Sequence, residues 1–251
     1  MTRHPVLLRL FHLLFCAAFL APAAHAAASL LISPINPVIE AGRNAGAIWV
    51  ENRGNSPVLL QARVFAWQQA EGEDRYSRQD AIVSSPPMVE IAPRSRQIIR
   101  LVRASIAQQD GEAAYRLLLD EVPTRKEAER ADETAPPPGV QFRLRYSLPL
   151  FTYGGKSSNR GEPQLQCAVI RKDGEHMLEI RNSGNMHARL VDAAFVEDGR
   201  HMPVGRGLLG YALAGSALRV PLADALEAHG SFSAKVNESA EPFPLSACAM
   251  Q

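Results

Sequence analysis

Cysteine is scarce in this chain of 251 residues, which contains only 3. So few cysteines cannot form the dense disulfide framework of a small secreted scaffold. An excess of one charge is also lacking, because 27 Lys and Arg face 26 Asp and Glu. Nucleic-acid-binding domains usually carry a clear basic excess, so this balance argues against a nucleic acid as partner. Hydrophobic residues at 46% and charged residues at 21% exclude wholesale disorder.

The usual motifs of catalysis are absent as well. The sequence has no phosphate-binding loop, no dinucleotide-binding glycine pattern, no zinc-protease motif, no C-x-x-C pair and no G-x-S-x-G elbow. Many carboxylate pairs are possible, but nothing singles one out. We therefore expect no enzyme, no metal site, no cofactor and no small-molecule substrate. Surface positions are expected for the four histidines outside the N-terminal segment, whose spacing lacks metal-ligand regularity: His176, His187, His201 and His229.

The N-terminal 26 residues contain the longest apolar run. Arg3 and Arg9 precede or flank the run at residues 10–20, and Ala-His-Ala at 24–26 matches an A-x-A cleavage site. This is the layout of a secretory signal peptide. A membrane anchor is the alternative, but it would need about 20 apolar residues. We predict cleavage after residue 26, no membrane insertion and a periplasmic location.

Beyond the signal peptide, short alternating or apolar runs are bounded by turn residues, and helical periodicity is rare. This pattern predicts an all-β fold of two immunoglobulin-like β-sandwich domains. The Gly- and Ser-rich stretch Thr152–Glu162 predicts a linker, so the expected domains are residues 27–153 and 154–251. The expected strands of the first domain are Leu30–Ile39, Ala47–Glu51, Val58–Trp67, Met88–Ile91, Gln97–Arg103, Ala114–Val122 and Val140–Phe151. Those of the second are Leu165–Arg171, Met177–Arg181, Ala188–Val196, Leu208–Leu213, Leu218–Leu222, Phe232–Val236 and Pro244–Met250.

An internal repeat supports this division. Ile48–Phe65 parallels Leu178–Phe195, because each has an apolar strand, then Asn-x-Gly-Asn, then a second strand. Asn and Gly tolerate the positive φ of tight turns between strands, and we expect them to act in that way here. Coincidence is the alternative, since the motif is short, but the matching strands around it favour a duplicated sandwich.

Two cysteines, Cys167 and Cys248, remain after removal of the signal peptide. An even pair in an exported protein most simply forms one disulfide. Because both lie in the last third of the chain, the bond would join the two ends of the second domain. Closing a loop of that length would stabilise the fold by about 3–5 kcal/mol in the chain-entropy model.

The segment Val140–Phe151 has the most distinctive pattern of the first domain. One face carries Val140, Phe142, Leu144 and Tyr146. The other face carries Gln141, Arg143 and Arg145. An ordinary core-facing edge strand is one interpretation. The other is an edge strand that lends its apolar side chains to a partner by β-augmentation, and the charged, Pro-rich loop before it would leave that edge accessible.

Taken in order, these segments resemble the periplasmic pilus-assembly chaperones of the chaperone–usher pathway, an immunoglobulin-like family. The resemblance rests on AAYRLLLDEVP at Ala113–Pro123, the charged loop after it, and the basic alternating strand that ends in SLPLF. Val83–Arg103 adds S-P-P and A-P-x-x-x-Q signals, and ASLLISPINPVIEAG resembles the first strand of the family. The ending RYSLPLF is similar to the archaic, spore-coat-protein-U-like branch. The match spans roughly residues 28–155, and the second domain only in outline.

The resemblance implies two domains in an L-shaped, boomerang-like arrangement. It also implies a chaperone that binds, folds and caps pilus subunits by donating an edge strand and delivers them to an outer-membrane usher. The partners would then be pilus subunits and the usher. The alternative is a structural or ligand-binding β-sandwich component of a pilus or secreted coat. Such a subunit should instead be a single incomplete domain with a donor extension of its own.

Basic residues in the cleft of these chaperones grip the C-terminal carboxylate of the subunit, and Arg side chains can do so through paired hydrogen bonds. The usual Arg of the first strand, expected near Pro34–Asn36, is missing from this sequence. The candidate anchors are therefore Arg143, Arg145, Arg100, Arg103 and Arg116.

Overall fold

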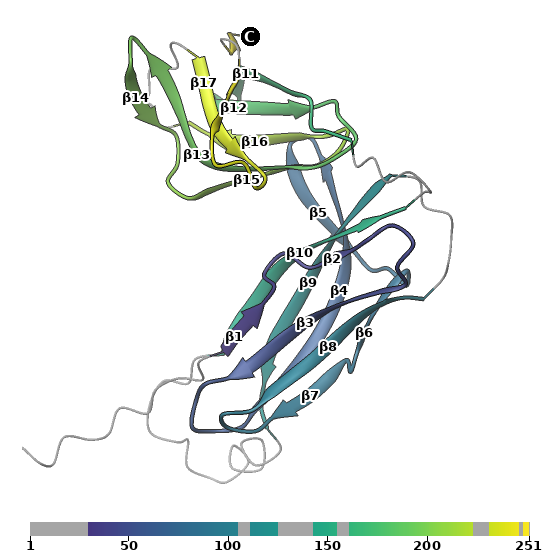
Figure 1. Cartoon of the computed structure of the whole chain (residues 1–251). Helices are drawn as coiled ribbons and strands as arrows, with labels where there is room; N and C mark the ends of the chain where they lie inside the picture. Colours follow the sequence, from purple (N-terminus) through teal and green to yellow (C-terminus); the bar gives the residue numbers. More distant parts are fainter. Residues whose placement is uncertain are drawn as a thin grey trace, which may run out of the picture.

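The computed structural model describes residues 30–104, 111–124, 143–154, 161–222, 231–245 and 248–250. In these residues the chain forms strands and no helix, which confirms the all-β prediction. Figure 1 shows two sandwiches, one from the purple-to-teal half of the chain and one from the green-to-yellow half, whose long axes meet at an angle. The predicted signal peptide, residues 1–26, lies outside the described residues.

The first two sheets, which we call the N-terminal sandwich, contain β1 to β10. One sheet has the order β1-β3-β8-β6, built from Leu30–Ser33, Ala45–Asn52, Arg96–Arg103 and Ile82–Ser85. The other has the order β2-β10-β9-β4-β5, built from Val38–Ile39, Arg145–Tyr153, Glu112–Val122, Val58–Ala70 and Glu73–Ser77, and β7 (Met88–Ile91) pairs with β4. Alternation along these strands places one apolar face of each sheet in a shared core that includes Ile48, Leu60, Leu101 and Leu117.

The C-terminal sandwich repeats this two-sheet plan. One sheet has the order β16-β12-β11-β19, built from Ala217–Pro221, Glu175–Asn182, Leu165–Lys172 and Ala249–Met250. The other has the order β14-β13-β17-β18, built from Arg200–Pro203, Ala188–Glu197, Ser231–Val236 and Pro242–Leu245, and β15 (Leu208–Ala212) pairs with β13. Phe195 and Phe232 meet edge to face in its core, with ring centroids 5.7 Å apart.

Several strand predictions were wrong in detail. The expected first strand, Leu30–Ile39, is two strands in different sheets, because Pro34 and Pro37 interrupt it and β2 crosses to pair with β10. The expected linker begins too early, since Thr152 and Tyr153 still belong to β10. The sequence pattern missed β5, β6 and β14. β5 is exposed along its whole length, so it lacks the apolar alternation that marks a half-buried strand.

The repeated Asn-x-Gly-Asn motif works differently from the expectation. Neither Gly54 nor Gly184 has a positive φ. Instead Asn52 is fully buried, donates from Nδ2 to the carbonyls of Ser56 (2.8 Å) and Ile91 (3.0 Å), and accepts the Gly54 N–H at Oδ1 (2.9 Å). The motif is therefore a buried amide that holds a loop together through its side chain.

Asn182 makes the equivalent contacts in the C-terminal sandwich. It is also fully buried, and its Nδ2 donates to the carbonyls of Met186 (2.8 Å) and Ala212 (3.0 Å). Its Oδ1 accepts the N–H groups of Gly184 and Gln164, each at 3.0 Å. The two sandwiches thus share the same local construction at the same point of the repeat.

Cys167 and Cys248 form a disulfide, as predicted, with Cα atoms 4.8 Å apart. Cys167 lies on β11 and Cys248 immediately precedes β19, the short strand that pairs in parallel with β11. The bond closes a sequence separation of 81 residues, nearly the whole C-terminal sandwich. Both cysteines pack against the core of that sandwich.

Replacing both cysteines with alanine is expected to lower the free energy of unfolding by about 2–5 kcal/mol, because the loop they close is long. Denaturant melts of the oxidised wild type and the double variant give this difference. Thiol titration of the denatured, unreduced wild type should find no free thiol in the mature chain. Two free thiols would contradict the disulfide.

Candidate functional site

The outer edge of β10 is open over most of its length. β10 pairs with β9 from Arg145↔Asp120 to Tyr153↔Glu112, whereas β2 covers its other side only at Phe151 and Thr152. Among the described residues, no strand pairs with the outer side of 145–150. This edge is therefore a template on which a further strand can form main-chain hydrogen bonds.

The backbone of β10 alternates between β9 and the open edge. The N–H of Glu121 donates to the carbonyl of Leu144 at 3.0 Å, and the N–H of Gly154 donates to that of Gly111 at 2.8 Å. Since alternate residues of an antiparallel pair share hydrogen bonds, the even-numbered residues of β10 bond to β9. The N–H and C=O groups of Arg145 and Ser147 therefore point to the open edge.

The apolar side chains that the sequence pattern grouped together lie on the core-facing side of β10 where the structure describes them. Tyr146 is partly buried against the core of the N-terminal sandwich, and Leu144, just before the strand, is 43% exposed. Val140 and Phe142 lie outside the described residues. The strand begins at Arg145, so within the described residues its start is later than predicted. An exposed Leu144 beside an open edge is the arrangement that strand addition needs.

Arg145 belongs to a three-residue charge cluster on the outer face of the sheet. Its Nε is hydrogen-bonded to Oδ1 of Asp120, and Arg63 donates to Oδ2 of the same carboxylate at 2.6 Å. Burial raises the pKa of Asp120, but the hydrogen bonds from Arg145 and Arg63 outweigh it and hold that pKa below its ordinary value. Two cations share one anion here, so the cluster keeps a net positive charge at the start of β10.

Two of the five candidate anchors lie away from the open edge. Arg103 is a structural contact, because its guanidinium donates to the carbonyls of Tyr153 (2.7 Å), Arg43 (3.2 Å) and Ile39 (3.4 Å). It thereby holds the end of β10 against β2 and the connection from β2 to β3. Arg100 is exposed on β8, in the other sheet, where it faces Ala47. Arg143 is exposed just before β10.

Arg116 lies where the two sandwiches meet. It is opposite Pro149 in the β9–β10 register, and its guanidinium carbon lies 3.9 Å from the ring centroid of Trp67 and 5.7 Å from that of Tyr211 in the C-terminal sandwich. Its ion pair with Asp74 is long, at 3.8 Å, and its buried Nε has no hydrogen-bond partner among the described residues. Arg116 is therefore a cation at the domain boundary with spare capacity to donate.

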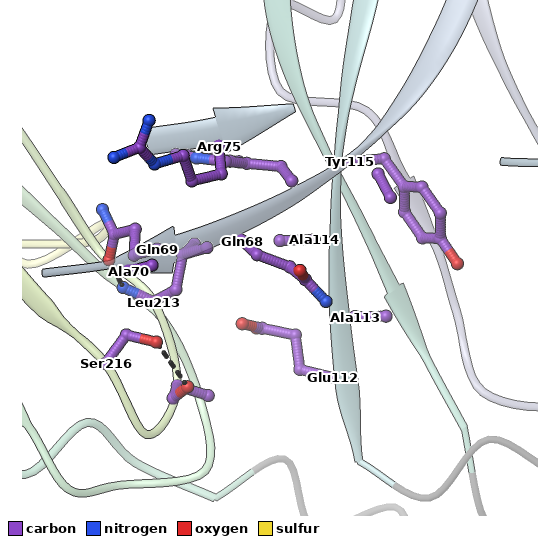
Figure 2. Close-up of a pocket in the computed structure, with 13 residues that line it drawn as sticks. Gln68, Gln69, Ala70, Arg75, Glu112, Ala113, Ala114, Tyr115, Leu213 and Ser216 are labelled. Carbon is purple, nitrogen blue, oxygen red and sulfur yellow. Dashed lines mark hydrogen bonds between the residues drawn. The ribbon is translucent and has the colours of Figure 1, made fainter. Parts of the chain in front are cut away.

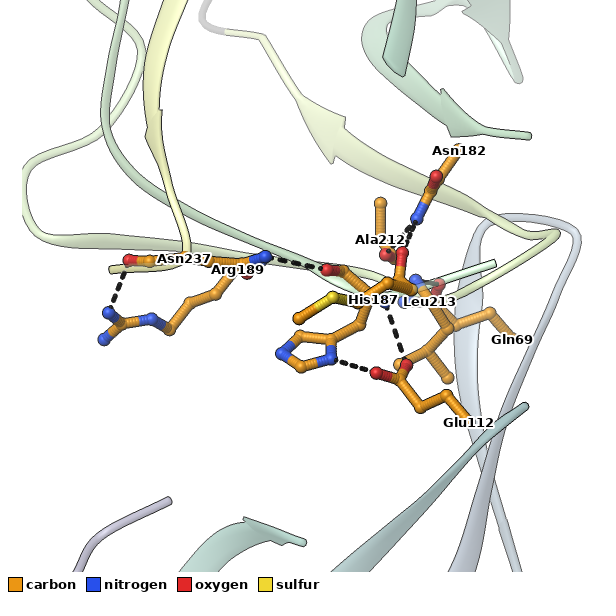
Figure 3. Close-up of polar contacts among 9 residues, drawn as sticks. Gln69, Glu112, Asn182, His187, Arg189, Ala212, Leu213 and Asn237 are labelled. Atoms are coloured by element: carbon orange, nitrogen blue, oxygen red, sulfur yellow. Dashed lines mark hydrogen bonds and ion pairs between the residues drawn. The ribbon is translucent and has the colours of Figure 1, made fainter. Parts of the chain in front are cut away.

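Polar contacts, some of them drawn in Figure 3, and one aromatic pair fix the two sandwiches against each other. Gln69 accepts the N–H of Leu213 at 2.9 Å and donates to the carbonyl of Tyr211 at 2.7 Å. The carboxylate of Glu112 accepts the backbone N–H of His187 at 2.9 Å and contacts its Nδ1 at 2.7 Å. His187 also stacks on Phe151, with centroids 3.5 Å apart.

The surface prediction was therefore wrong for His187, although His176 and His201 are exposed and His229 lies outside the described residues. Sequence reasoning missed the Glu112–His187 pair because 75 residues separate its members. Neither residue has a local pattern that points to the other. Only the packing of the two sandwiches brings them together.

A pocket of about 540 Å³ lies beside these contacts. Figure 2 shows Gln68, Gln69 and Glu112 of the N-terminal sandwich on one side and Leu213 and Ser216 of the C-terminal sandwich on the other. The pocket walls carry a mixture of amide, carboxylate, hydroxyl and alanine groups, with Tyr115 and Arg75 at the margin. Residues of both sandwiches line it.

The described residues contain no cluster of three or more His, Cys, Asp or Glu that could hold a metal ion. In the same residues, no helix has the length and apolarity to cross a bilayer.

Comparisons with known proteins agree on one family. Residues 30–153 match the model of the pili and flagellar-assembly chaperone family, PapD N-terminal domain. Among solved structures, the chain is similar to the chaperone of the CsuC–CsuE chaperone–tip adhesion subunit complex from archaic Csu pili of Acinetobacter baumannii. The identity is 27%, the TM-score is 0.68, and the match covers 89% of this chain and 99% of that chain.

Two more distant structures have the same fold. The SafB chaperone of Salmonella enterica, solved with the SafA pilin, is 16% identical with a TM-score of 0.62, over 87% of this chain and 96% of that chain. The chaperone DraB of E. coli is 16% identical with a TM-score of 0.60, over 89% and 97%. Comparison with curated protein sequences gave no match.

Proposed function

The chain belongs to the family of pili and flagellar-assembly chaperones, and on this premise we propose that it captures a strand of a pilus subunit at the open edge of β10. The observation that carries this proposal is the edge itself. Arg145 and Ser147 present backbone groups there with which no described strand pairs, and Leu144 is exposed beside them. A guest strand that pairs with this edge extends the sheet and covers Leu144 and the partly buried Tyr146.

The subunit partner is the class that the similar structures contain, since the CsuC chaperone was solved with a tip adhesion subunit. Delivery of the captured subunit to an outer-membrane usher completes the proposed function. A chaperone fits better than a structural pilus component, because two sandwiches follow one another in this chain. The match to the Csu chaperone also covers 99% of the length of that chaperone. Strand capture needs no bond-making chemistry, so we infer a non-enzymatic protein.

We infer further that the chain is exported by its signal peptide, residues 1–26, and acts in the periplasm. The mature chain then consists of an N-terminal domain at 27–153 and a C-terminal domain at 154–251. Capture takes place without nucleotide, metal or cofactor, because its free energy comes from apolar burial and main-chain hydrogen bonds.

Arg116 is our choice among the five candidates for the anchor of the subunit carboxylate. It lies between the two sandwiches, its Nε finds no hydrogen-bond partner in the part of the chain that the structure describes, and the contact to Asp74 is long, at 3.8 Å. Arg145 already shares Asp120 with Arg63, and the donors of Arg103 bond to carbonyls. If the C-terminal carboxylate of the guest strand binds Arg116, that chain end lies near Pro149. β10 also runs from Arg145 toward Pro149, so the guest strand would run parallel to β10.

The test compares two Arg→Gln variants in capture of a pilus subunit co-expressed in the periplasm. Arg116→Gln should weaken capture roughly 30-fold or more, because losing one partner of a buried charge pair typically costs 2–5 kcal/mol. Arg100→Gln, on the opposite sheet, is the matched control and should bind as wild type does. Dissociation constants of the purified complexes give both values.

Arg143→Gln and Arg145→Gln complete the comparison. If either weakens capture more than Arg116→Gln does, the anchor lies at the start of β10 instead. Thermal melts of the free variants separate a loss of binding from a loss of fold.

A further inference from the structure

The open edge of β10 is limited in length, and Pro149 lies at its limit. The even-numbered residues of β10 form their backbone hydrogen bonds with β9. The backbone groups that point away from β9, toward the open edge, therefore belong to Arg145, Ser147, Pro149 and Phe151. Arg145 and Ser147 each offer a guest strand an N–H donor and a carbonyl. Pro149 has no N–H, so it offers only its carbonyl.

The next outward donor is already used. The N–H of Phe151 donates to the carbonyl of Pro37 at 3.3 Å, and β2 pairs with Phe151 and Thr152. A strand that advances along β10 toward the C-terminal sandwich therefore meets a residue without a donor and then a segment that β2 occupies. The last outward N–H available to the guest belongs to Ser147.

We propose that Pro149 terminates the guest ladder and so determines how far the strand of the subunit can advance along β10. Pro149 is thus a specificity-determining residue, because it sets the register between guest and chaperone. The proposal rests on capture at β10, which is part of the proposed function. The occupant is the terminal strand of a pilus subunit, whose end would lie beside Pro149 and its cross-strand neighbour Arg116.

General protection of the edge does not explain this placement. Prolines do block edge-to-edge pairing when they interrupt an exposed strand. Pro149, however, lies at the inner limit of the open edge, next to the part covered by β2, and leaves Arg145 and Ser147 unprotected. Its position blocks advance toward the second sandwich but not pairing along the outer part of the strand.

The experiment measures backbone amide exchange in the full mature chain, with and without a ten-residue peptide of alternating valine and threonine that ends in a free carboxylate. In the wild type, peptide should protect the outward amides of Arg145 and Ser147. In Pro149→Ala, it should also protect the new amide at position 149. The added hydrogen bond should tighten peptide binding roughly 2- to 12-fold. Pro93→Ala, an exposed proline in the β7–β8 connection, is the matched control and should leave the affinity unchanged.

The outcomes separate the two proposals. Protection of Arg145 and Ser147 without protection at position 149 in Pro149→Ala, and with unchanged affinity, would overturn the terminator role while leaving capture at β10 intact. Absence of protection at Arg145 and Ser147 in the wild type would overturn capture at this edge, and the terminator role with it. Thermal melts of Pro149→Ala without peptide show whether the loss of the buried ring alters the fold itself.

Discussion

Leu144→Arg is expected to abolish capture of a pilus subunit while the free chaperone stays folded. Leu144 is 43% exposed before the start of β10, so an arginine there meets water in the free protein. In the complex the same position is covered by the guest strand. Capture would then lose the roughly 1.5–3 kcal/mol of a buried leucine and would also bury an unpaired charge, which costs more.

Co-purification of the chaperone with a co-expressed subunit, followed by sizing of the complex, measures this effect. Leu208→Arg is a matched control, because Leu208 is also exposed but lies on β15 of the C-terminal sandwich, away from the β10 edge. It should leave capture unchanged. Phe142→Arg is expected to behave like Leu144→Arg.

Unfolding of the free Leu144→Arg or Phe142→Arg protein would refute this expectation. It would mean that these side chains are ordinary core, as in the first interpretation of the strand. A variant that melts like wild type and still captures the subunit would refute strand donation at this position.

Asn52→Ala is expected to cost about 3–6 kcal/mol of folding free energy. The substitution removes three hydrogen bonds from a fully buried site, those to the carbonyls of Ser56 and Ile91 and that from the N–H of Gly54. Each buried group left unsatisfied costs roughly 1–3 kcal/mol. Asn182→Ala should act in the same way on the C-terminal sandwich.

Asn55→Ala is the control from the same motif. Asn55 is exposed, and its side chain accepts a hydrogen bond from the exposed Arg94 at 2.8 Å, so the change should stay within about 0.5 kcal/mol of wild type. Denaturant melts of the three variants give the differences. A cost below about 1 kcal/mol for Asn52→Ala would show that the buried amide does not hold the loop.

The local pattern of the sequence was sufficient for the fold class and the repeat. Strand alternation is a property of neighbouring residues, so it identified the cores of most strands, including β4, β9 and β13. It failed where neighbours carry no apolar signal, as in the exposed β5. The repeat was visible because Asn52 and Asn182 occur in matching contexts, although their buried hydrogen bonds were not.

The sequence by itself therefore determined an all-β chain of two sandwiches, one disulfide and a family resemblance, because period-two patterns, cysteine number and motif order are all written along the chain. Tertiary structure alone decided which edge of β10 is open, and that Arg116 rather than Arg100 lies between the sandwiches. It also decided that the backbone nitrogen of Pro149, which carries no hydrogen, points to the open edge. A one-residue shift of register would turn that nitrogen toward β9 instead. These are relations between residues far apart in sequence, and only the paired sheets bring them together.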